Sequence, residues 1–88
     1  MSDLQTQFEQ AKVDSEHLPK RPANNDLLKL YSLYKQSTMG DVSGERPGIR
    51  DMQGRMKYDA WSKLRGVARE QAMTDYIALV THLKASGA

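Results

Sequence analysis

The sequence ANNDLLKLYSLYKQSTMG, residues 23–40, predicts one long helix that is apolar on nearly every side. Its start is indicated by Pro22, because proline lacks an N–H that the first turn of a helix leaves unpaired. Its end is indicated by Gly40, because glycine readily adopts the positive φ found just past a helix. Apolar and aromatic residues recur through the segment, at Leu27, Leu28, Leu30, Tyr31, Leu33 and Tyr34. Such a helix is expected to lie at the centre of a bundle.

Three other segments carry apolar residues at the spacing of a helix face and are predicted to be helices: 4–18, 52–65 and 68–85. We expect Ser2 and Gln5 to form a capping box before the first of them, and Asp51 to cap the helix that begins at residue 52. Met56 belongs to the apolar stripe of that helix and is expected to face the core. No strand-like alternation competes with this pattern, so the predicted class is all-α with four helices.

The connection DVSGERPGIRD, residues 41–51, is longer than the roughly two to eight residues that usually join helices in a bundle. Long connections in compact domains tend to cross the fold or to serve a site. We therefore expect this segment to do one or the other.

Length and composition exclude several classes of protein. Eighty-eight residues suffice for one domain, expected to span 1–88, and the absence of cysteine excludes disulfide frameworks and thiol catalysis. A net charge of +2 is too small for a general nucleic-acid-coating protein, so no nucleic-acid partner is expected. No apolar run is long enough for membrane insertion, and MSDLQTQFEQ lacks the features of a secretory signal. We expect a cytoplasmic protein.

The positive charge is concentrated in the middle of the chain. Residues 31–66 carry seven Lys or Arg and four Asp or Glu, an excess of +3. Two readings remain open from this pattern: a local anion-binding site, or a helical module that binds a protein or nucleic acid through its basic face. Only the second predicts binding that weakens steeply with salt regardless of any apolar group on the ligand.

The helix over 23–39 carries polar groups beside its apolar surface. Tyr31, Tyr34 and Lys35 share one broad face, and Leu27 and Leu28 lie a turn earlier. This combination suits a ligand with an anionic head and an apolar tail. The simpler interpretation is that both tyrosines are core residues and that the lysine reaches solvent.

Further candidates lie on the next two helices. Lys57 begins a second cluster, KYDAW, and Tyr76 carries another phenol; each has a plain structural interpretation, as a solvated charge and as a bundle residue. His17 and His82 have no metal-ligand spacing, and no phosphate loop or nucleophile motif is present. We expect neither an enzyme nor a metal site, although a small enzyme stays a third hypothesis.

Four blocks together carry a resemblance that spans nearly the whole chain: YSLYKQSTMGD at 31–41, ERPG at 45–48, KYDAW at 57–61 and AMTDYI at 72–77. In this order and spacing the sequence resembles the acyl-CoA-binding protein family. The resemblance implies an up-down-down-up bundle of four helices, with the long connection crossing between the second and third helices. It implies a non-catalytic intracellular carrier and buffer of medium- to long-chain acyl-CoA esters, bound as ligand without a further cofactor. It also implies a monomer that contacts acyl-CoA-using enzymes transiently.

The resemblance also assigns roles to residues. It implies that Tyr31, Lys35 and Lys57 hold the 3′-phosphate of the nucleotide, that Tyr34 lies near the adenine, and that Tyr76 contacts the ligand. Leu27 and Leu28 fall where the family lines its acyl groove. Further candidates near the site are Lys12, Glu16, Ser32, Leu33 and Gln53.

The sequence departs from the common family pattern at several positions. Glu16 and Gln53 stand where many members carry lysine, which bears on the affinity for the nucleotide. Lys12, one turn before Glu16, is a candidate to compensate the reversed charge. Tyr58 replaces a frequent tryptophan, and we expect a modest effect of this change on packing.

Overall fold

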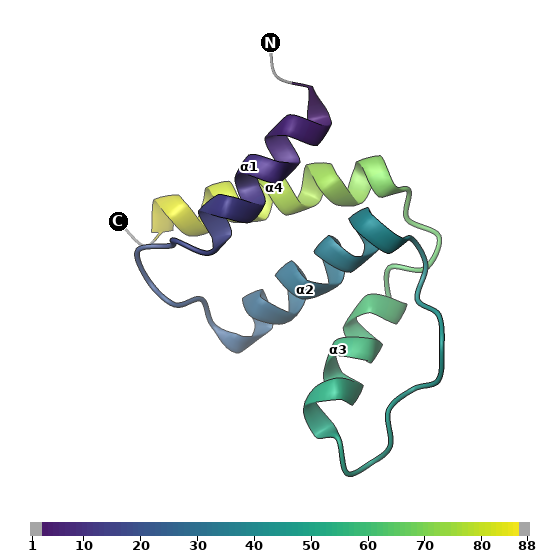
Figure 1. The fold of residues 1–88 in the computed structure, drawn as a ribbon. Helices are drawn as coiled ribbons and strands as arrows, with labels where there is room; N and C mark the ends of the chain where they lie inside the picture. Colours follow the sequence, from purple (N-terminus) through teal and green to yellow (C-terminus); the bar gives the residue numbers. More distant parts are fainter. Residues whose placement is uncertain (1–2, 87–88) are drawn as a thin grey trace.

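The computed structural model describes residues 3–86, which form four helices: α1 (Leu4–Ser15), α2 (Asn24–Met39), α3 (Met52–Ser62) and α4 (Arg69–Ser86). No β-strand occurs within this range (Figure 1). The prediction of an all-α protein with four helices is confirmed.

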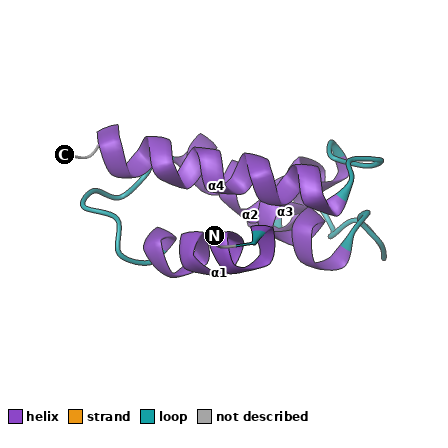
Figure 2. Cartoon of the chain, turned by 90° about the horizontal axis from the view of Figure 1, so that it is seen from above, coloured by secondary structure: helices purple, strands orange, loops and turns teal. Residues whose placement is uncertain are grey.

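The second helix is central, as its composition predicts. α2 packs against both α3 and α4, whereas α1 packs against α4. α2 and α3 run in the same direction and α1 and α4 run the other way, which confirms the up-down-down-up arrangement (Figure 1). Seen from above, α4 extends along most of the molecule beside α1 (Figure 2). A buried cluster joins α1, α2 and α4: Phe8, Ala11, Leu30, Tyr76 and Val80.

The first helix ends earlier than its apolar spacing predicts. α1 stops at Ser15 rather than at residue 18, because the next two amides bond to carbonyls three residues back, at 3.1 Å for Glu16 and 3.0 Å for His17. This tighter turn ends the helix. The predicted capping residue Ser2 lies outside the described residues. Asp3 is the N-cap, and its carboxylate accepts a hydrogen bond from the amide of Thr6 at 2.7 Å.

Four other boundaries differ from the predicted ones by one to three residues: the start of α2, the end of α3 and both ends of α4. The end of α2 at Met39 and the start of α3 at Met52 agree with the prediction. α2 begins at Asn24, after an N-cap, Ala23, that offers no side-chain acceptor. α3 ends at Ser62, and short turns lead to Gly66, whose φ is 89°. Two predicted signals of helix boundaries are confirmed, one for the end of α2 and one for the start of α3. Gly40 has a φ of 80° directly after α2, and the carboxylate of Asp51 accepts a hydrogen bond from the amide of Gly54 at 2.9 Å.

A buried glutamine fixes the start of the long connection. Gln36 on α2 is 0% exposed, and its amide nitrogen donates to the carboxylate of Asp41 and to the carbonyl of Val67, both at 2.9 Å. The indole nitrogen of Trp61 donates to the Gln36 side-chain oxygen at 3.1 Å and to the carbonyl of Gly40 at 2.9 Å. The end of α2, the start of the connection, α3 and the turn before α4 are therefore joined through one side chain.

The rest of the connection lies along α3 and returns the chain to the opposite end of the molecule (Figure 1). Arg46 pairs with Asp59 through two hydrogen bonds, of 2.8 and 2.7 Å. The Tyr58 hydroxyl donates to the carbonyl of Gly44 at 3.0 Å. The connection therefore crosses the fold, as the resemblance implies, and Tyr58 contributes a contact that depends on its phenol.

Several carboxylates gain their hydrogen bonds only in the folded chain. The amide of Gly66 and the side chain of Gln36 lower the pKa of Asp41 below its ordinary value. The guanidinium of Arg46 lowers the pKa of Asp59 in the same direction. A carboxylate whose pKa is lowered by folding stabilises the folded state only while it is ionised.

Acid is therefore expected to destabilise the protein over a defined range. Folding lowers the pKa of four aspartates: Asp3, Asp14, Asp41 and Asp59. Their carboxylates stabilise the fold at pH values above 3.8, the ordinary pKa of an aspartate, and this stability is lost as the pH falls through their lower pKa values in the folded protein. We expect the free energy of unfolding, measured by urea titration, to fall between about pH 4 and pH 2. In Asp41→Asn the fall should be shallower. Stability that increases on acidification through this range would contradict the assignment.

Candidate functional site

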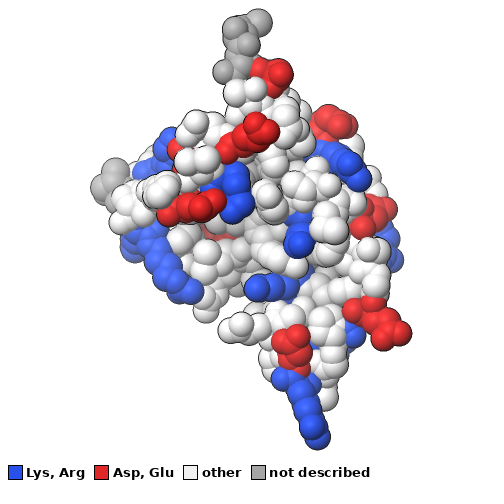
Figure 3. Space-filling view, viewed as in Figure 1, with Lys and Arg blue, Asp and Glu red and all other residues white. Residues whose placement is uncertain are grey.

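Two adjoining hollows lie on the surface of α2 and meet at Leu27. The first, called the α1–α2 hollow, has a volume of about 430 Å³ and is lined by Lys12, Ser15, Glu16, Leu27, Leu30, Tyr31, Tyr34, Lys35 and Tyr76. The second, called the α2–α3 hollow, has a volume of about 280 Å³ and is lined by Arg21, Asn24, Leu27, Leu28, Gln53, Met56 and Lys57. Figure 3 shows basic side chains on the face where α2 lies between α1 and α3, with uncharged surface between them.

Two lysines from different helices flank the ring of Tyr31. The ammonium nitrogen of Lys35, on α2, lies 5.7 Å from the ring centroid, and that of Lys57, on α3, lies 5.3 Å from it. Lys35 also lies 5.9 Å from the centroid of Trp61. Within residues 3–86, neither ammonium lies within 4.0 Å of a carboxylate oxygen. The structure thus brings together the three residues predicted to hold a phosphate, and it leaves both ammonium groups without a carboxylate partner there.

Tyr34 and Tyr76 belong to an aromatic cluster under the α1–α2 hollow. The ring of Tyr34 stacks on Phe8 with centroids 5.7 Å apart, and Tyr76 packs against both rings at 5.1 Å and 6.0 Å. Tyr76 is only 2% exposed, its hydroxyl donates to the hydroxyl of Ser15 at 3.1 Å, and burial raises the pKa of its phenol. Tyr76 is therefore a core residue that reaches the site at its edge, and its contact with a ligand stays a prediction.

The α1 side of the first hollow carries an ion pair. The ammonium of Lys12 donates to a carboxylate oxygen of Glu16 at 3.1 Å and lies 5.2 Å from the centroid of the Tyr34 ring. The hydrogen bond to Glu16 raises the pKa of Lys12. The positive charge of Lys12 is thus largely balanced, unlike the charges of Lys35 and Lys57.

The remaining candidates divide between the hollows and the core. Leu27, Leu28 and Gln53 line the α2–α3 hollow. Ser32 is buried and donates to the carbonyl of Lys29 at 3.1 Å, and Leu33 packs against the buried cluster. The last two therefore line neither hollow.

Met56 lies in the site rather than in the core, which corrects the expectation from its apolar stripe. Its side chain is 49% exposed and lines the α2–α3 hollow. α3 packs against α2 alone, and Trp61 occupies that contact. Because the two residues are five apart, they lie about 140° from each other around the helix and cannot share one narrow face.

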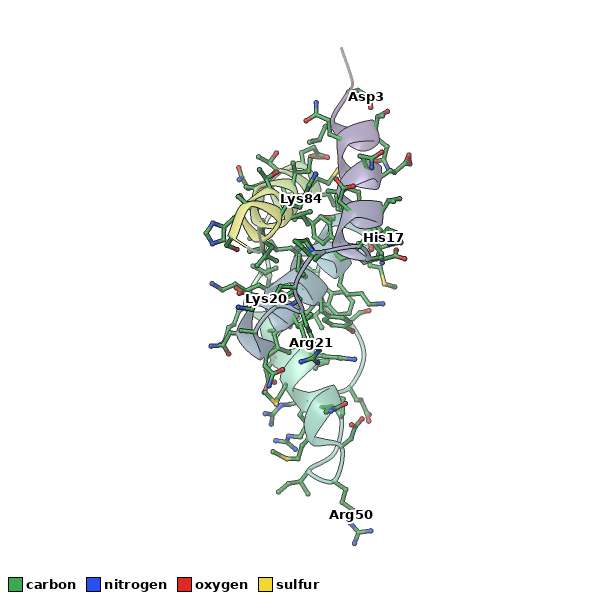
Figure 4. The ribbon with its side chains drawn as sticks, turned by 90° about the vertical axis from the view of Figure 1, so that its left-hand side faces the viewer. Asp3, His17, Lys20, Arg21, Arg50 and Lys84 are labelled. Carbon is green, nitrogen blue, oxygen red and sulfur yellow. The ribbon has the colours of Figure 1, made fainter. Side chains whose placement is uncertain are left out.

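Arg21 and Asn24 also line the α2–α3 hollow and were not among the predicted site residues. Figure 4 shows Arg21 where the chain enters α2, in front of the junction with α3. The sequence offered no periodic signal for either residue, because both lie at or before the first turn of α2.

The described residues also bear on metal binding and on membrane crossing. Between Asp3 and Ser86, no group of three His, Asp or Glu side chains is arranged to hold a metal ion. In the same range, no helix is both long enough and apolar enough to cross a bilayer.

Comparison with known sequences gives a consistent match. Residues 5–80 match the model of the family described as Acyl CoA binding protein. The chain is 46% identical over 84 residues to an acyl-CoA-binding protein homolog from Manduca sexta, a match that covers 94% of this chain and 93% of that protein. It is 49% identical over 75 residues to the acyl-CoA-binding protein of Saccharomyces cerevisiae, covering 85% of each.

Comparison with solved structures agrees with the sequence matches. The chain superimposes on the crystal structure of acyl-CoA-binding protein 2 from Oryza sativa with a TM-score of 0.91 and 43% sequence identity, covering 94% of this chain and 90% of that one. Sequence and fold therefore agree along most of the chain. The protein belongs to the acyl-CoA-binding protein family.

Proposed function

We propose that the whole chain, 1–88, is one acyl-CoA-binding domain that acts as a cytoplasmic carrier and buffer. It binds medium- to long-chain acyl-CoA esters reversibly as a monomer, makes and breaks no covalent bond, needs no cofactor, and meets acyl-CoA-using enzymes only transiently. The observation that carries this proposal is the pair of lysines around Tyr31, each without a carboxylate partner among the described residues and both beside apolar hollows.

The polar head of the ligand suits the region around Tyr31. A phosphate monoester is a doubly charged acceptor that forms short, charge-assisted hydrogen bonds with ammonium groups. Lys35 and Lys57 offer such donors from two helices, and the Tyr31 hydroxyl is a further donor. In this proposal the 3′-phosphate of the nucleotide is therefore held by Tyr31, Lys35 and Lys57.

The apolar tail suits the neighbouring α2–α3 hollow. Leu27, Leu28 and Met56 supply apolar surface there, and Leu27 also lines the α1–α2 hollow, so the two ends of one ligand can occupy adjoining sites. Burial of a methylene contributes about 0.8 kcal/mol. Affinity is expected to depend on chain length for as long as added methylenes remain buried.

Calorimetric titration with octanoyl-, dodecanoyl- and palmitoyl-CoA tests the proposal. We expect saturable binding of palmitoyl-CoA at micromolar protein, and an affinity that increases by up to about fourfold per added methylene until the apolar surface is filled. Absence of saturable heat with palmitoyl-CoA would refute the function. An affinity independent of chain length would refute the place given to the tail.

Two further assays distinguish the rival hypotheses. A basic interaction module predicts binding to short nucleic acids that falls steeply with salt, which a titration at two salt concentrations reveals. A thioester hydrolase would release the thiol of CoA. Because the chain contains no cysteine, a thiol reagent added to a mixture of protein and palmitoyl-CoA reports hydrolysis without background from the protein. We expect no increase in free thiol above the protein-free control.

A further inference from the structure

An ion pair on α1 borders the proposed ligand site. Lys12 and Glu16 lie one turn apart, their charged atoms are 3.1 Å apart, and both side chains line the α1–α2 hollow together with Lys35. The ammonium of Lys12 also lies over the ring of Tyr34, at 5.2 Å from its centroid. An anion that enters this hollow therefore meets a cation that is already paired.

The carboxylate of Glu16 contributes little to the stability of the fold. The side chains of Lys12 and Glu16 are 41% and 57% exposed, and exposed pairs at this spacing stabilise a helix only slightly. Glu16 is also the C-cap of α1, where the negative end of the helix dipole opposes a carboxylate. Loss of the negative charge removes one exposed ion pair and relieves this repulsion, so its net effect on the fold is small.

The charge has a larger consequence for the site. Lys35 and Lys57 have no carboxylate partner among the described residues, whereas Lys12 is balanced by Glu16. A ligand phosphate near α1 gains the full attraction of Lys12 only when the pair opens, and it is repelled by Glu16 until then. The hollow thus has one side that attracts an anion freely and one side on which a carboxylate competes with it.

We propose that Glu16 competes with the anionic head of the ligand for Lys12, and that it thereby limits affinity and shortens the lifetime of the complex. This inference rests on the acyl-CoA binding proposed above. It makes Glu16 a determinant of how readily the carrier releases its ligand. The pair acts through charge alone and requires no movement of the helices.

The test is a titration of wild type and Glu16→Gln with palmitoyl-CoA at low and high salt. We expect Glu16→Gln to bind about threefold to tenfold more tightly at low salt, because Lys12 is freed and a repulsive charge is removed. Stopped-flow dissociation, followed by the fluorescence of Trp61, the chain's only tryptophan, should be slower in the variant. The gain should shrink at high salt, since both charges are exposed.

Two further variants show whether the effect is local and depends on Lys12. Glu9→Gln makes the same change of net charge elsewhere on α1, where Glu9 accepts from Gln5 at 3.2 Å and lines neither hollow. We expect it to leave the affinity unchanged. In a Lys12→Met background, which keeps an apolar stem against Tyr34, Glu16→Gln should gain less than about twofold, because no ammonium is left to free.

The outcomes separate this inference from the function on which it rests. Measurable binding by wild type with no gain in Glu16→Gln overturns the role of Glu16 and leaves the carrier function standing. An equal gain in Glu9→Gln, or an undiminished gain in the Lys12→Met background, overturns competition for Lys12. Failure of wild type and Glu16→Gln alike to bind palmitoyl-CoA overturns the carrier function and this inference with it.

Discussion

Replacement of both Lys35 and Lys57 by alanine is expected to weaken palmitoyl-CoA binding about a hundredfold, with about tenfold from each lysine alone. The two ammonium groups approach the Tyr31 ring from α2 and α3, at 5.7 and 5.3 Å from its centroid, and neither is held by a carboxylate among the described residues. Each can therefore give its hydrogen bonds to a phosphate without breaking an ion pair first. Calorimetric titration of the single and double variants measures the loss.

The ligand itself supplies the sharpest control for this prediction. Dephospho-CoA esters lack the 3′-phosphate, so the losses in Lys35→Ala and Lys57→Ala should be much smaller with these ligands. Lys29→Ala serves as the matched variant, because Lys29 is an exposed lysine on α2 that lines neither hollow. Equal losses of affinity with both ligands would refute the binding of the 3′-phosphate by Lys35 and Lys57. A loss of the same size in Lys29→Ala would show that the effect comes only from the change in net charge.

Gln36→Leu is expected to lower the free energy of unfolding by about 2–4 kcal/mol. The change keeps nearly the same volume but removes hydrogen bonds to Asp41 and Val67 and one from Trp61, all at a fully buried side chain. In the variant the carbonyl of Val67 has lost its hydrogen-bond donor. An acceptor left unpaired away from water costs more free energy than a typical hydrogen bond contributes to stability. For a domain of this size, the loss corresponds to a melting temperature lower by about 10–25 °C.

Urea unfolding followed by Trp61 fluorescence measures this loss, because the same indole donates to Gln36. Gln71→Leu is the matched control: Gln71 is exposed on α4 and donates to Asp75, one turn away on the same helix. We expect a change below about 0.5 kcal/mol there. Equal stability of Gln36→Leu and wild type would show that the buried hydrogen bonds do not hold the connection.

Much of the architecture follows from local signals in the sequence. The apolar residues on all sides of 23–39 predicted a central helix, and Gly40 and Asp51 correctly marked the end of α2 and the start of α3. These signals work because capping and periodicity depend on residues only a few positions apart. The ends of α1 and α3 were less predictable, because short turns replace the last part of each apolar stripe.

Residues whose place depends on distant partners were harder to predict. Gln36 reads as an ordinary polar residue, yet it is buried because segments 5, 25 and 31 residues away supply its partners. Met56 was assigned to the core because its periodicity does not reveal that α3 has one neighbour. Tyr31, Lys35 and Lys57 were assigned together only through the family resemblance, since spacing within one helix cannot predict the approach of another.

The packing of α1 on α4 also determines when the chain can complete its fold during synthesis. α1 packs on α4, and two hydrogen bonds between them join residues far apart in the sequence: Tyr76 and Ser15 are 61 residues apart, and Lys84 and Asp14 are 70 apart. A chain emerging from a ribosome can stack Phe8 on Tyr34 of α2, but Phe8 and Ala11 lack their contacts with α4 until residues 69–86 have followed. The α1–α2 hollow, which Tyr76 helps to line, is completed only when α4, the last of these four helices, has been made.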